Sequence, residues 1–408
     1  MVDQDRPQCT VVGIGADGWS GLSAPAQQLV RAADVVFGSD RQLELLSREI
    51  TARRVQWPSP LLPALPGLLD EHRAAQLVVL ASGDPMFFGI GSTLVRLLGP
   101  ERVVAVPAPS SLSLACARLG WQVGEVEVVS AVGRPLSALH PAVQPGRQVA
   151  VLVGDGAGAR KICELLVARG YGASVVTALA QLGGEDERIV AATANDWGAA
   201  EHDPLAVVAI ECRADAGTRP LPRSPGLPDD AFDHDGQITK SEIRAITLAA
   251  LAPVPGQLLW DVGAGSGSVG IEWLRTHPAC RAVAIEPRAD RRERIARNAV
   301  ALGVEGLRIV AGEAPEVLAD LPVPDAVFVG GAVSRPGVIE ACLHALPVGG
   351  RLVANAVTVE SEGTLAGWQA RLGGRLIRLA IQRAAPVGGF TGWRPAMPVT
   401  QWSYWKAA

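Results

Sequence analysis

A glycine-rich segment in the second half of the chain holds the residues best suited to chemistry. Gly263-Ala264-Gly265-Ser266-Gly267 follows the apolar run 258–262. Glycine lets a backbone approach a ligand closely and adopt positive φ. Glu286 stands 19 residues after Gly267, where a carboxylate can accept hydrogen bonds from two ribose hydroxyls. The order of strand, glycine-rich turn, helix, strand and acidic residue predicts a site for a nucleoside-containing cofactor.

Two glycine-containing segments of the first half are further candidates. Segment 11–18 (VVGIGADG) resembles a dinucleotide fingerprint but lacks its third glycine and is not followed at once by a helix. Segment 82–89 (SGDPMFFG) follows an apolar run. There Gly83 allows close backbone approach, Pro85 fixes a turn, and Asp84 can accept hydrogen bonds from a cofactor. An ordinary Asp-Pro turn is the alternative interpretation.

The elements around these segments alternate between strand and helix. Apolar runs and periodicity predict strands at 257–262, 282–285, 307–310, 326–329 and 351–354, with helices at 289–301 and 335–345. This pattern is typical of a parallel, doubly wound sheet. Runs 375–381 and 399–405 have no helix between them and predict a terminal antiparallel pair.

The first half shows the same α/β character, with strands predicted at 9–14, 77–81, 102–106 and 205–210 and a helix at 24–33. A chain of 408 residues exceeds the usual size of one domain. A segment rich in Pro, Gly and Asp lacks apolar periodicity at 214–230. We therefore expect domains at 1–213 and 231–408, joined by a linker at 214–230.

Composition excludes several classes of protein. The net charge is -4 and no basic run occurs, so a nucleic-acid partner is not expected. The six cysteines are widely spaced, without a C-x-x-C pair, which indicates buried thiols in a reducing compartment and no metal site. The first seven residues lack a signal-peptide pattern, and no apolar run reaches the ~20 residues of a membrane span. A cytoplasmic protein without membrane contact is expected.

The second-half motif resembles that of class I methyltransferases. Asp261-Val262-Gly263-x-Gly265-x-Gly267 matches their first motif, and the terminal antiparallel pair matches their sheet edge. The resemblance implies S-adenosylmethionine as cofactor and methyl transfer, not hydride transfer. Phe328-Val329 leads into Gly330-Gly331-Ala332 and not into the Asn/Asp-Pro-Pro-aromatic motif of enzymes that methylate exocyclic amines. Methylation of nucleic-acid bases is therefore disfavoured.

Segment 237–244 (QITKSEIR) resembles the first helix of the cobalamin-pathway methylases that act on carbon 15 and remove an acetate carboxyl group. This implies that Thr239 touches the cofactor; alternatively, Thr239 caps the helix and Glu242 completes a capping box. The same resemblance implies that residues 263–267, Glu286 and Ala314 line the S-adenosylmethionine site, with Ala314 beside the adenine. It also places Gly330-Gly331 and segment 355–360 near the substrate entrance.

The first half is similar to the tetrapyrrole methylase superfamily. The opening glycine-rich loop, segments 33–36 (ADVV), 82–89, 106–113 and 182–188 match that family in order. The resemblance implies a two-lobed fold with S-adenosylmethionine held between the lobes, contacted by Gly83, Asp84 and Ser111. The chain departs from the pattern at Val132, where relatives often have His, so no catalytic role for that His is available.

The tandem of these two types resembles the family of decarboxylating precorrin-6Y methylases of corrin biosynthesis. It implies two molecules of S-adenosylmethionine, one per domain, and conversion of precorrin-6Y to precorrin-8X. Domain 1–213 would methylate carbon 5; domain 231–408 would methylate carbon 15 and decarboxylate the ring C acetate. Relatives imply a homo-oligomer, for example a tetramer. We further hypothesise that Arg244 or Lys240 holds substrate carboxylates and that His234 handles a proton.

Two other functions stay open from the residues alone. A class I RNA or small-molecule methyltransferase with an accessory lobe would need a basic surface or an amine-methylation motif, and the sequence shows neither. A non-catalytic cofactor sensor would bind S-adenosylmethionine without turnover.

Overall fold

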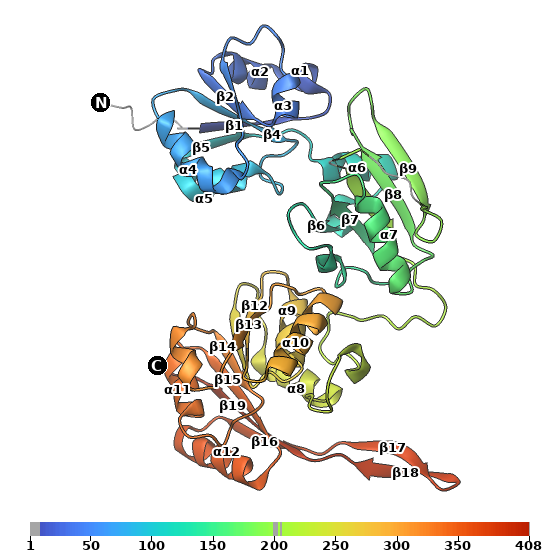
Figure 1. Ribbon diagram of the computed structural model, residues 1–408, viewed down its shortest axis with the longest axis vertical. Coiled ribbons are helices and arrows are strands. Elements are labelled where there is room, and N and C mark those ends of the chain that lie inside the picture. The colour runs from blue at the N-terminus through green and yellow to red at the C-terminus, as the bar shows by residue number, and fades with distance from the viewer. Residues whose placement is uncertain (1–8, 199–202, 205, 408) are drawn as a thin grey trace. The chain divides into compact units, whose positions relative to one another are not determined.

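The structure is a computed structural model that describes residues 9–198, 203–204 and 206–407. The chain divides into two compact units, the first formed by Met1–Arg134 and Ala142–Thr218 and the second by Pro135–Pro141 and Arg219–Ala408 (Figure 1). The first seven residues, on which the expectation of no signal peptide rests, lie outside the described residues, as does Leu205 in the predicted strand 205–210. Within the described ranges no helix is long and apolar enough to cross a membrane.

The first lobe of unit 1 is a parallel sheet with strand order β3-β2-β4-β1-β5. Alternate residues of its interior strand β1 enter two cores: Val12 and Ile14 on one face, Cys9 and Val11 on the other. Burial on both faces explains the continuous apolar run of the sequence. The elements are β1 (Cys9–Ile14), α1 (Gly18–Gly21), α2 (Ala24–Arg31), β2 (Val35–Gly38), α3 (Asp40–Glu44), β3 (Arg53–Gln56), α4 (Leu61–Glu71), β4 (Leu77–Ser82), α5 (Ile90–Leu98), η1 (Pro100–Arg102) and β5 (Val103–Val106).

The second lobe of unit 1 has strand order β6-β7-β10-β8-β9 and is largely antiparallel, with only β6 and β7 parallel. Helix α6 supplies Leu112, Ala115 and Cys116 to its core. The sequence predicted only one strand here. The elements are α6 (Ser111–Leu119), η2 (Val123–Glu125), β6 (Glu127–Ser130), η3 (Leu136–Leu139), β7 (Gln148–Leu152), α7 (Gly158–Ala168), β8 (Val175–Ala180), β9 (Arg188–Thr193) and β10 (Val207–Glu211), with η3 counted in unit 2.

Unit 2 contains a seven-stranded sheet of order β13-β12-β11-β14-β15-β19-β16. Its first five strands are parallel, and β19 runs antiparallel to both β15 and β16. The predicted parallel sheet with an antiparallel edge is therefore confirmed. The elements are η4 (Asp229–Ala231), α8 (Ser241–Leu251), β11 (Leu258–Val262), α9 (Ser268–Thr276), β12 (Arg281–Glu286), α10 (Ala289–Ala301), β13 (Arg308–Ala311), η5 (Glu316–Asp320), β14 (Ala326–Val329), α11 (Val338–Ala345), β15 (Arg351–Ala356), α12 (Val359–Leu372), β16 (Arg375–Leu379), β17 (Gln382–Val387), β18 (Phe390–Pro395) and β19 (Val399–Trp405).

A two-stranded hairpin of unit 2 was not predicted. Between the two terminal strands the chain forms the β17–β18 hairpin, which extends away from the rest of the unit (Figure 1). Several of its large apolar side chains are exposed, most of all Phe390 at 85% and Trp393 at 71%. The segment has few buried positions, so its pattern carried no core-facing signal.

A buried ion pair joins helix α8 to helix α9. Arg244 and Glu272 are 0% and 2% exposed, and Nε of Arg244 lies 2.6 Å from Oε1 of Glu272. Glu272 also accepts hydrogen bonds from the backbone N–H groups of Gly226 and Leu227 at 2.7 and 2.9 Å. Because Arg244, Glu272 and Leu227 are buried, each depends on the others to offset its lost hydration.

We expect Glu272→Ala to destabilise unit 2 by about 3–5 kcal/mol, since the buried Arg244 guanidinium loses its nearer carboxylate and keeps only Asp229, at 3.5 Å. Thermal unfolding of the full chain would show the transition of unit 2 at a lower temperature. The control is Asp290→Ala, which breaks the exposed Arg288–Asp290 pair and should have a far smaller effect. Equal shifts in the two variants would contradict the structural role of the buried pair.

Candidate active sites

The glycine-rich loop of unit 2 follows β11, the middle one of the five parallel strands, at the carboxyl edge of the sheet. Gly263, Gly265 and Gly267 all have left-handed φ angles, of 72°, 60° and 76°, which non-glycine residues rarely adopt. The N–H groups of Gly263 and Ala264 both donate to the carbonyl of Ile285, at 3.0 and 3.1 Å. The loop is thereby fixed against strand β12.

Glu286 ends strand β12 and faces the same loop. Its side chain is buried, and Oε2 accepts a hydrogen bond from the Gly265 N–H at 2.9 Å, while Oε1 accepts one from the Arg288 N–H at 3.1 Å. Each carboxylate oxygen keeps a second lone pair for a ligand hydroxyl. The structure thus holds the acidic residue against the glycine-rich loop, as a ribose-binding site requires.

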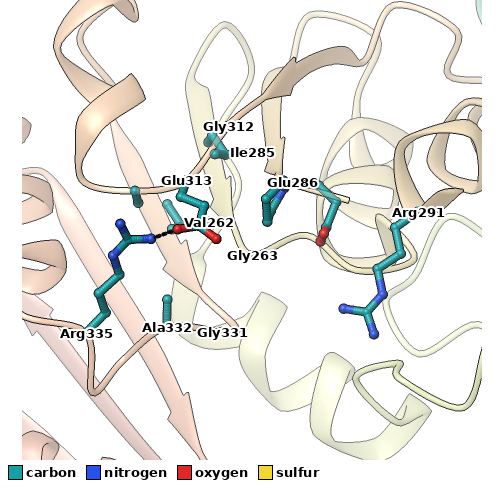
Figure 2. Close-up of a pocket in the computed structure, with 12 residues that line it drawn as sticks. Val262, Gly263, Ile285, Glu286, Arg291, Gly312, Glu313, Gly331, Ala332 and Arg335 are labelled. Carbon is teal, nitrogen blue, oxygen red and sulfur yellow. Dashed lines mark hydrogen bonds and ion pairs between the residues drawn. The ribbon is translucent and has the colours of Figure 1, made fainter. Parts of the chain in front are cut away.

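A cavity of about 210 Å³ lies at this edge of the sheet. Its position next to β11 and β14 is where the strand order changes direction, the usual ligand position in open α/β sheets. Figure 2 shows Glu286 and Arg291 on one side and Glu313 beside Arg335 on the other. Its lining residues are Val262, Gly263, Ile285, Glu286, Pro287, Arg291, Gly312, Glu313, Ala314, Gly331, Ala332 and Arg335.

Of the predicted residues, Gly263, Glu286 and Ala314 line this cavity, and Gly265 is bonded to Glu286. Ala264, Ser266 and Gly267 belong to the same loop but are not among the lining residues. Thr239 is half-buried and is also not a lining residue. Its segment nevertheless lies close to the loop, since the Gln237 carbonyl oxygen would be 3.5 Å from a Cβ placed on Gly265.

The alternative interpretation of Thr239 as a helix cap is wrong. Helix α8 is capped by Lys240 without a side-chain hydrogen bond. The Thr239 carbonyl accepts a hydrogen bond from Arg244 instead, and the Glu242 carboxylate pairs with Arg383 of β17. The predicted capping box is absent, since Lys240 and not Thr239 is the N-cap residue and the Glu242 carboxylate binds Arg383, which is distant in the sequence.

The hypothesis that Arg244 holds substrate carboxylates is also wrong, since its side chain is fully buried against Glu272. Lys240 pairs with Asp229 at 3.3 Å. The His234 ring accepts a hydrogen bond from the Gly236 N–H at 3.0 Å, a local turn contact. The role of Arg244 could not be predicted from the sequence, because its partner Glu272 lies on another helix.

Three charged residues of the cavity were not predicted. Arg335 pairs with Glu313 and, at 2.9 Å, with Glu316; Arg291 pairs with Asp235 at 3.1 Å. Glu313 stands in the predicted segment around Ala314, which is the one signal that could have identified it. Arg291 is one of several arginines of α10, and nothing in its local pattern marks it.

Asp261, which precedes the loop, is a buried carboxyl group with an incomplete set of hydrogen bonds among the described residues. Its Oδ2 accepts a hydrogen bond from the Gly270 N–H at 2.9 Å, while Oδ1 has no hydrogen-bond partner among the described residues. Burial raises the pKa of this carboxyl to about 7; the Gly270 hydrogen bond opposes the shift and the charge of Glu286 adds to it. A carboxyl with a raised pKa binds its proton more tightly in the folded state than in the unfolded state.

This proton makes the stability of unit 2 depend on pH. Its contribution is complete below the unfolded pKa near 4 and is lost as pH rises through about 7. Asp261→Asn removes the titration, so we expect its stability relative to wild type to increase, on the order of 1–4 kcal/mol between pH 4 and 8. Thermal unfolding across this range is the measurement, with exposed Asp320→Asn as control. Parallel curves for wild type and Asp261→Asn would contradict the assignment.

In unit 1, three loops meet at the carboxyl edge of the first sheet. A Cβ placed on Gly13 would lie 2.0 Å from the Gly83 carbonyl oxygen and 2.6 Å from the Ala108 nitrogen. Gly83 has φ of 62°, and its N–H donates to the Ile14 carbonyl at 3.0 Å. Strands β1, β4 and β5 are neighbours in this sheet. Glycine is therefore required at both positions for the loops to pack.

The other predicted residues of unit 1 adjoin this contact. Asp84 is half-buried, and its Oδ1 accepts a hydrogen bond from the Met86 N–H at 2.8 Å, which forms a local turn. Ser111 is exposed in the first turn of α6, and its nitrogen lies 3.6 Å from a Cβ placed on Gly83. From the second lobe, Gly184 lies so close to Ala16 that a Cβ on it would be 2.9 Å from the Ala16 side chain.

Known proteins resemble each unit and the whole chain. Precorrin methyltransferase domains match residues 230–406, and tetrapyrrole (corrin/porphyrin) methylases match residues 8–197. A precorrin-6Y C(5,15)-methyltransferase (decarboxylating) from Sinorhizobium is 51% identical over 98% of this chain and 97% of the relative. The chain belongs to this family.

Two shorter relatives of this decarboxylating methyltransferase family match less than half of the chain. One is a cobalt-precorrin-7 C(5)-methyltransferase from Salmonella typhimurium, 33% identical over 44% of this chain and 88% of its own length. The other is named probable cobalt-precorrin-6B C(15)-methyltransferase (decarboxylating), from Pyrobaculum calidifontis, 38% identical over 34% of this chain and 73% of its own length. The C(5) and C(15) methyltransferase names are therefore also carried by two separate proteins.

Proposed function

We propose that the chain converts precorrin-6Y to precorrin-8X, methylating carbons 5 and 15 and decarboxylating the ring C acetate. The methyl donor is S-adenosylmethionine, which supplies an electrophilic methyl group and leaves as S-adenosylhomocysteine. The observation that carries this proposal is the match to a relative of that name at 51% identity across nearly the full length of both chains.

We assign carbon 5 to domain 1–213 and carbon 15 with decarboxylation to domain 231–408, with 214–230 as the connection. The matches of tetrapyrrole methylases to residues 8–197 and of precorrin methyltransferase domains to residues 230–406 support this division. The half-length relatives with C(5) and C(15) names support it further.

Each domain would hold one donor molecule at its glycine-rich loop. In the second, Glu286 would bind the ribose hydroxyls, because Oε2 is already held against the loop by the Gly265 N–H, and Ala314 would pack against the adenine. The buried carboxylate and the small residues of the cavity wall fit such a ligand. The proposed donor contacts are Gly83, Asp84 and Ser111 in the first domain and Thr239, Gly263, Ala264, Gly265, Ser266, Gly267, Glu286 and Ala314 in the second.

The chemistry demands positioning more than acid or base catalysis. Both target carbons belong to an electron-rich reduced macrocycle, so each site chiefly holds a carbon in line with the methyl group and excludes water. Among the described residues no group of three or more His, Cys, Asp or Glu side chains could hold a metal ion. Decarboxylation leaves an electron pair that the conjugated ring can absorb.

We also propose that the protein acts in the cytoplasm as a homo-oligomer, with four chains as the arrangement to test first. All six cysteines are buried and unpaired, which suits a reducing compartment. The β17–β18 hairpin supports self-association. A two-stranded hairpin is marginally stable alone, and contact with a second copy of the chain would bury its exposed aromatic residues.

Phe390→Glu with Trp393→Glu should therefore dissociate the oligomer, since charges on the hairpin would oppose burial of its apolar face. Sedimentation velocity would show the mass of one chain for the variant and a multiple of it for wild type. A wild-type protein that sediments as one chain would contradict the proposal.

The decisive test of function is mass spectrometry of precorrin-6Y after incubation with the enzyme and isotopically labelled S-adenosylmethionine. We expect two labelled methyl groups and the loss of one carboxyl group in the product. Binding of the donor without turnover would favour a cofactor sensor, and a single methyl group with the carboxyl retained would contradict the carbon 15 assignment.

A further inference from the structure

Phe88, in the loop after β4, has an uncommon backbone conformation and an exposed ring. Its φ is 54° and its side chain is 50% exposed. A bulky residue in the left-handed region is strained, and an exposed aromatic ring gains little from folding to compensate. Strain retained at a surface position next to a ligand loop is characteristic of function.

The surrounding loop holds Phe88 in place. The Phe87 N–H donates to the Asp84 carbonyl at 3.1 Å, and the Gly91 N–H donates to the Pro85 carbonyl at 3.0 Å. The Phe87 ring packs against the core of the second lobe and meets the Phe88 ring edge-on, with centroids 5.0 Å apart. The backbone hydrogen bonds before and after Phe88, together with the Phe87 ring, therefore fix the position of the exposed Phe88 ring.

Arg134 stands over this ring. Its guanidinium carbon lies 5.8 Å from the Phe88 ring centroid. The residue is exposed, and no acidic side chain in the described part of the chain forms an ion pair with it. This contrasts with Arg118 of the same unit, which is bound by Glu187 and lowers the pKa of that carboxyl. The charge of Arg134 is left available to a ligand.

The pair combines two kinds of recognition at the proposed donor site. Phe88 belongs to the same loop as Gly83, and Arg134 follows strand β6 of the second lobe. A flat conjugated ring bearing carboxylates offers a π surface to an aromatic side chain and a planar anion to a guanidinium, which binds carboxylates in two parallel hydrogen bonds.

We propose that Phe88 and Arg134 bind the macrocycle for methylation at carbon 5, the ring of Phe88 against the macrocycle and the guanidinium of Arg134 on one peripheral carboxylate. This inference rests on the proposed function and deepens it, since it names substrate-binding residues of the first domain.

The test is steady-state kinetics of the full chain carrying Arg134→Gln, with the two reactions separated by mass, because only the carbon 15 product has lost carbon dioxide. We expect KM for the macrocycle in carbon 5 methylation to rise about 10- to 100-fold, with kcat changed little. Carbon 15 methylation and donor binding by calorimetry should match wild type. Phe88→Leu should raise the same KM by a smaller factor, and Arg134→Lys should recover part of the loss.

The matched control is Arg102→Gln. Arg102 is also exposed, but it precedes β5 at the amino edge of the sheet, opposite the donor loop, so its variant should behave as wild type. An unchanged KM in Arg134→Gln, or equal losses at both carbons, would overturn the inference alone. Absence of carbon 5 methylation in the wild type would overturn the proposed function and the inference with it.

Discussion

Gly265→Val is expected to abolish methylation at carbon 15 while methylation at carbon 5 continues. Gly265 has φ of 60°, a conformation that a β-branched residue can hardly adopt. Its N–H also donates to Glu286 at 2.9 Å, so a shifted backbone would disturb the proposed ribose-binding carboxylate as well. Misplacement by about 1 Å can cost roughly 100-fold in rate, and we expect a loss of at least that size.

Labelled product analysis would measure this effect. The variant should yield a macrocycle with one labelled methyl group and all its carboxyl groups. Gly306→Val is the control in the same unit, because nothing lies within 4 Å of a Cβ at that position. Loss of both methylations in a folded Gly265→Val protein would contradict two separable sites.

Gly83→Val is expected to have the reciprocal effect, with at least about 100-fold loss of carbon 5 methylation. Its φ is 62°, and a Cβ would lie 2.9 Å from the Pro109 carbonyl oxygen. Because this is a backbone atom, no change of side-chain rotamer can relieve the clash. The loops of β4 and β5 would separate, and with them the proposed donor contacts at Asp84 and Ser111.

The product of Gly83→Val should carry the carbon 15 methyl group and lack one carboxyl group. Calorimetry should detect one bound donor per chain in place of two. Gly124→Val serves as control, since a Cβ there meets nothing within 4 Å. Normal carbon 5 methylation by Gly83→Val would exclude the Gly-Asp-Pro loop from the first site.

Local features of the chain were readable without the structure. Helix α10 occupies Ala289–Ala301, and strand β1 Cys9–Ile14, at the predicted bounds. Apolar periodicity and turn residues are local properties that the backbone obeys wherever the element lies. The three glycines of the unit 2 loop were equally readable, because their left-handed angles demand glycine in any context.

The roles of charged side chains could not be predicted from the sequence. Arg244 looked like a surface or substrate-binding arginine, yet it is buried on Glu272, 28 residues further along the chain. Whether a charge is solvated, paired or free depends on which elements meet, and strand order decides that. For the same reason, the ion pair between Arg335 and Glu313 in the cavity wall could not be predicted from the sequence.

The sequence by itself thus determined the succession of strands and helices, the two glycine-rich loops and the acid that faces one of them. Only the tertiary structure decided that the second lobe is largely antiparallel, that a hairpin extends from the sheet edge, and that Arg134 meets Phe88. The physical reason is range: torsional preference and apolar periodicity are properties of a few neighbouring residues, whereas charge pairing and ring contacts join groups that folding alone brings together.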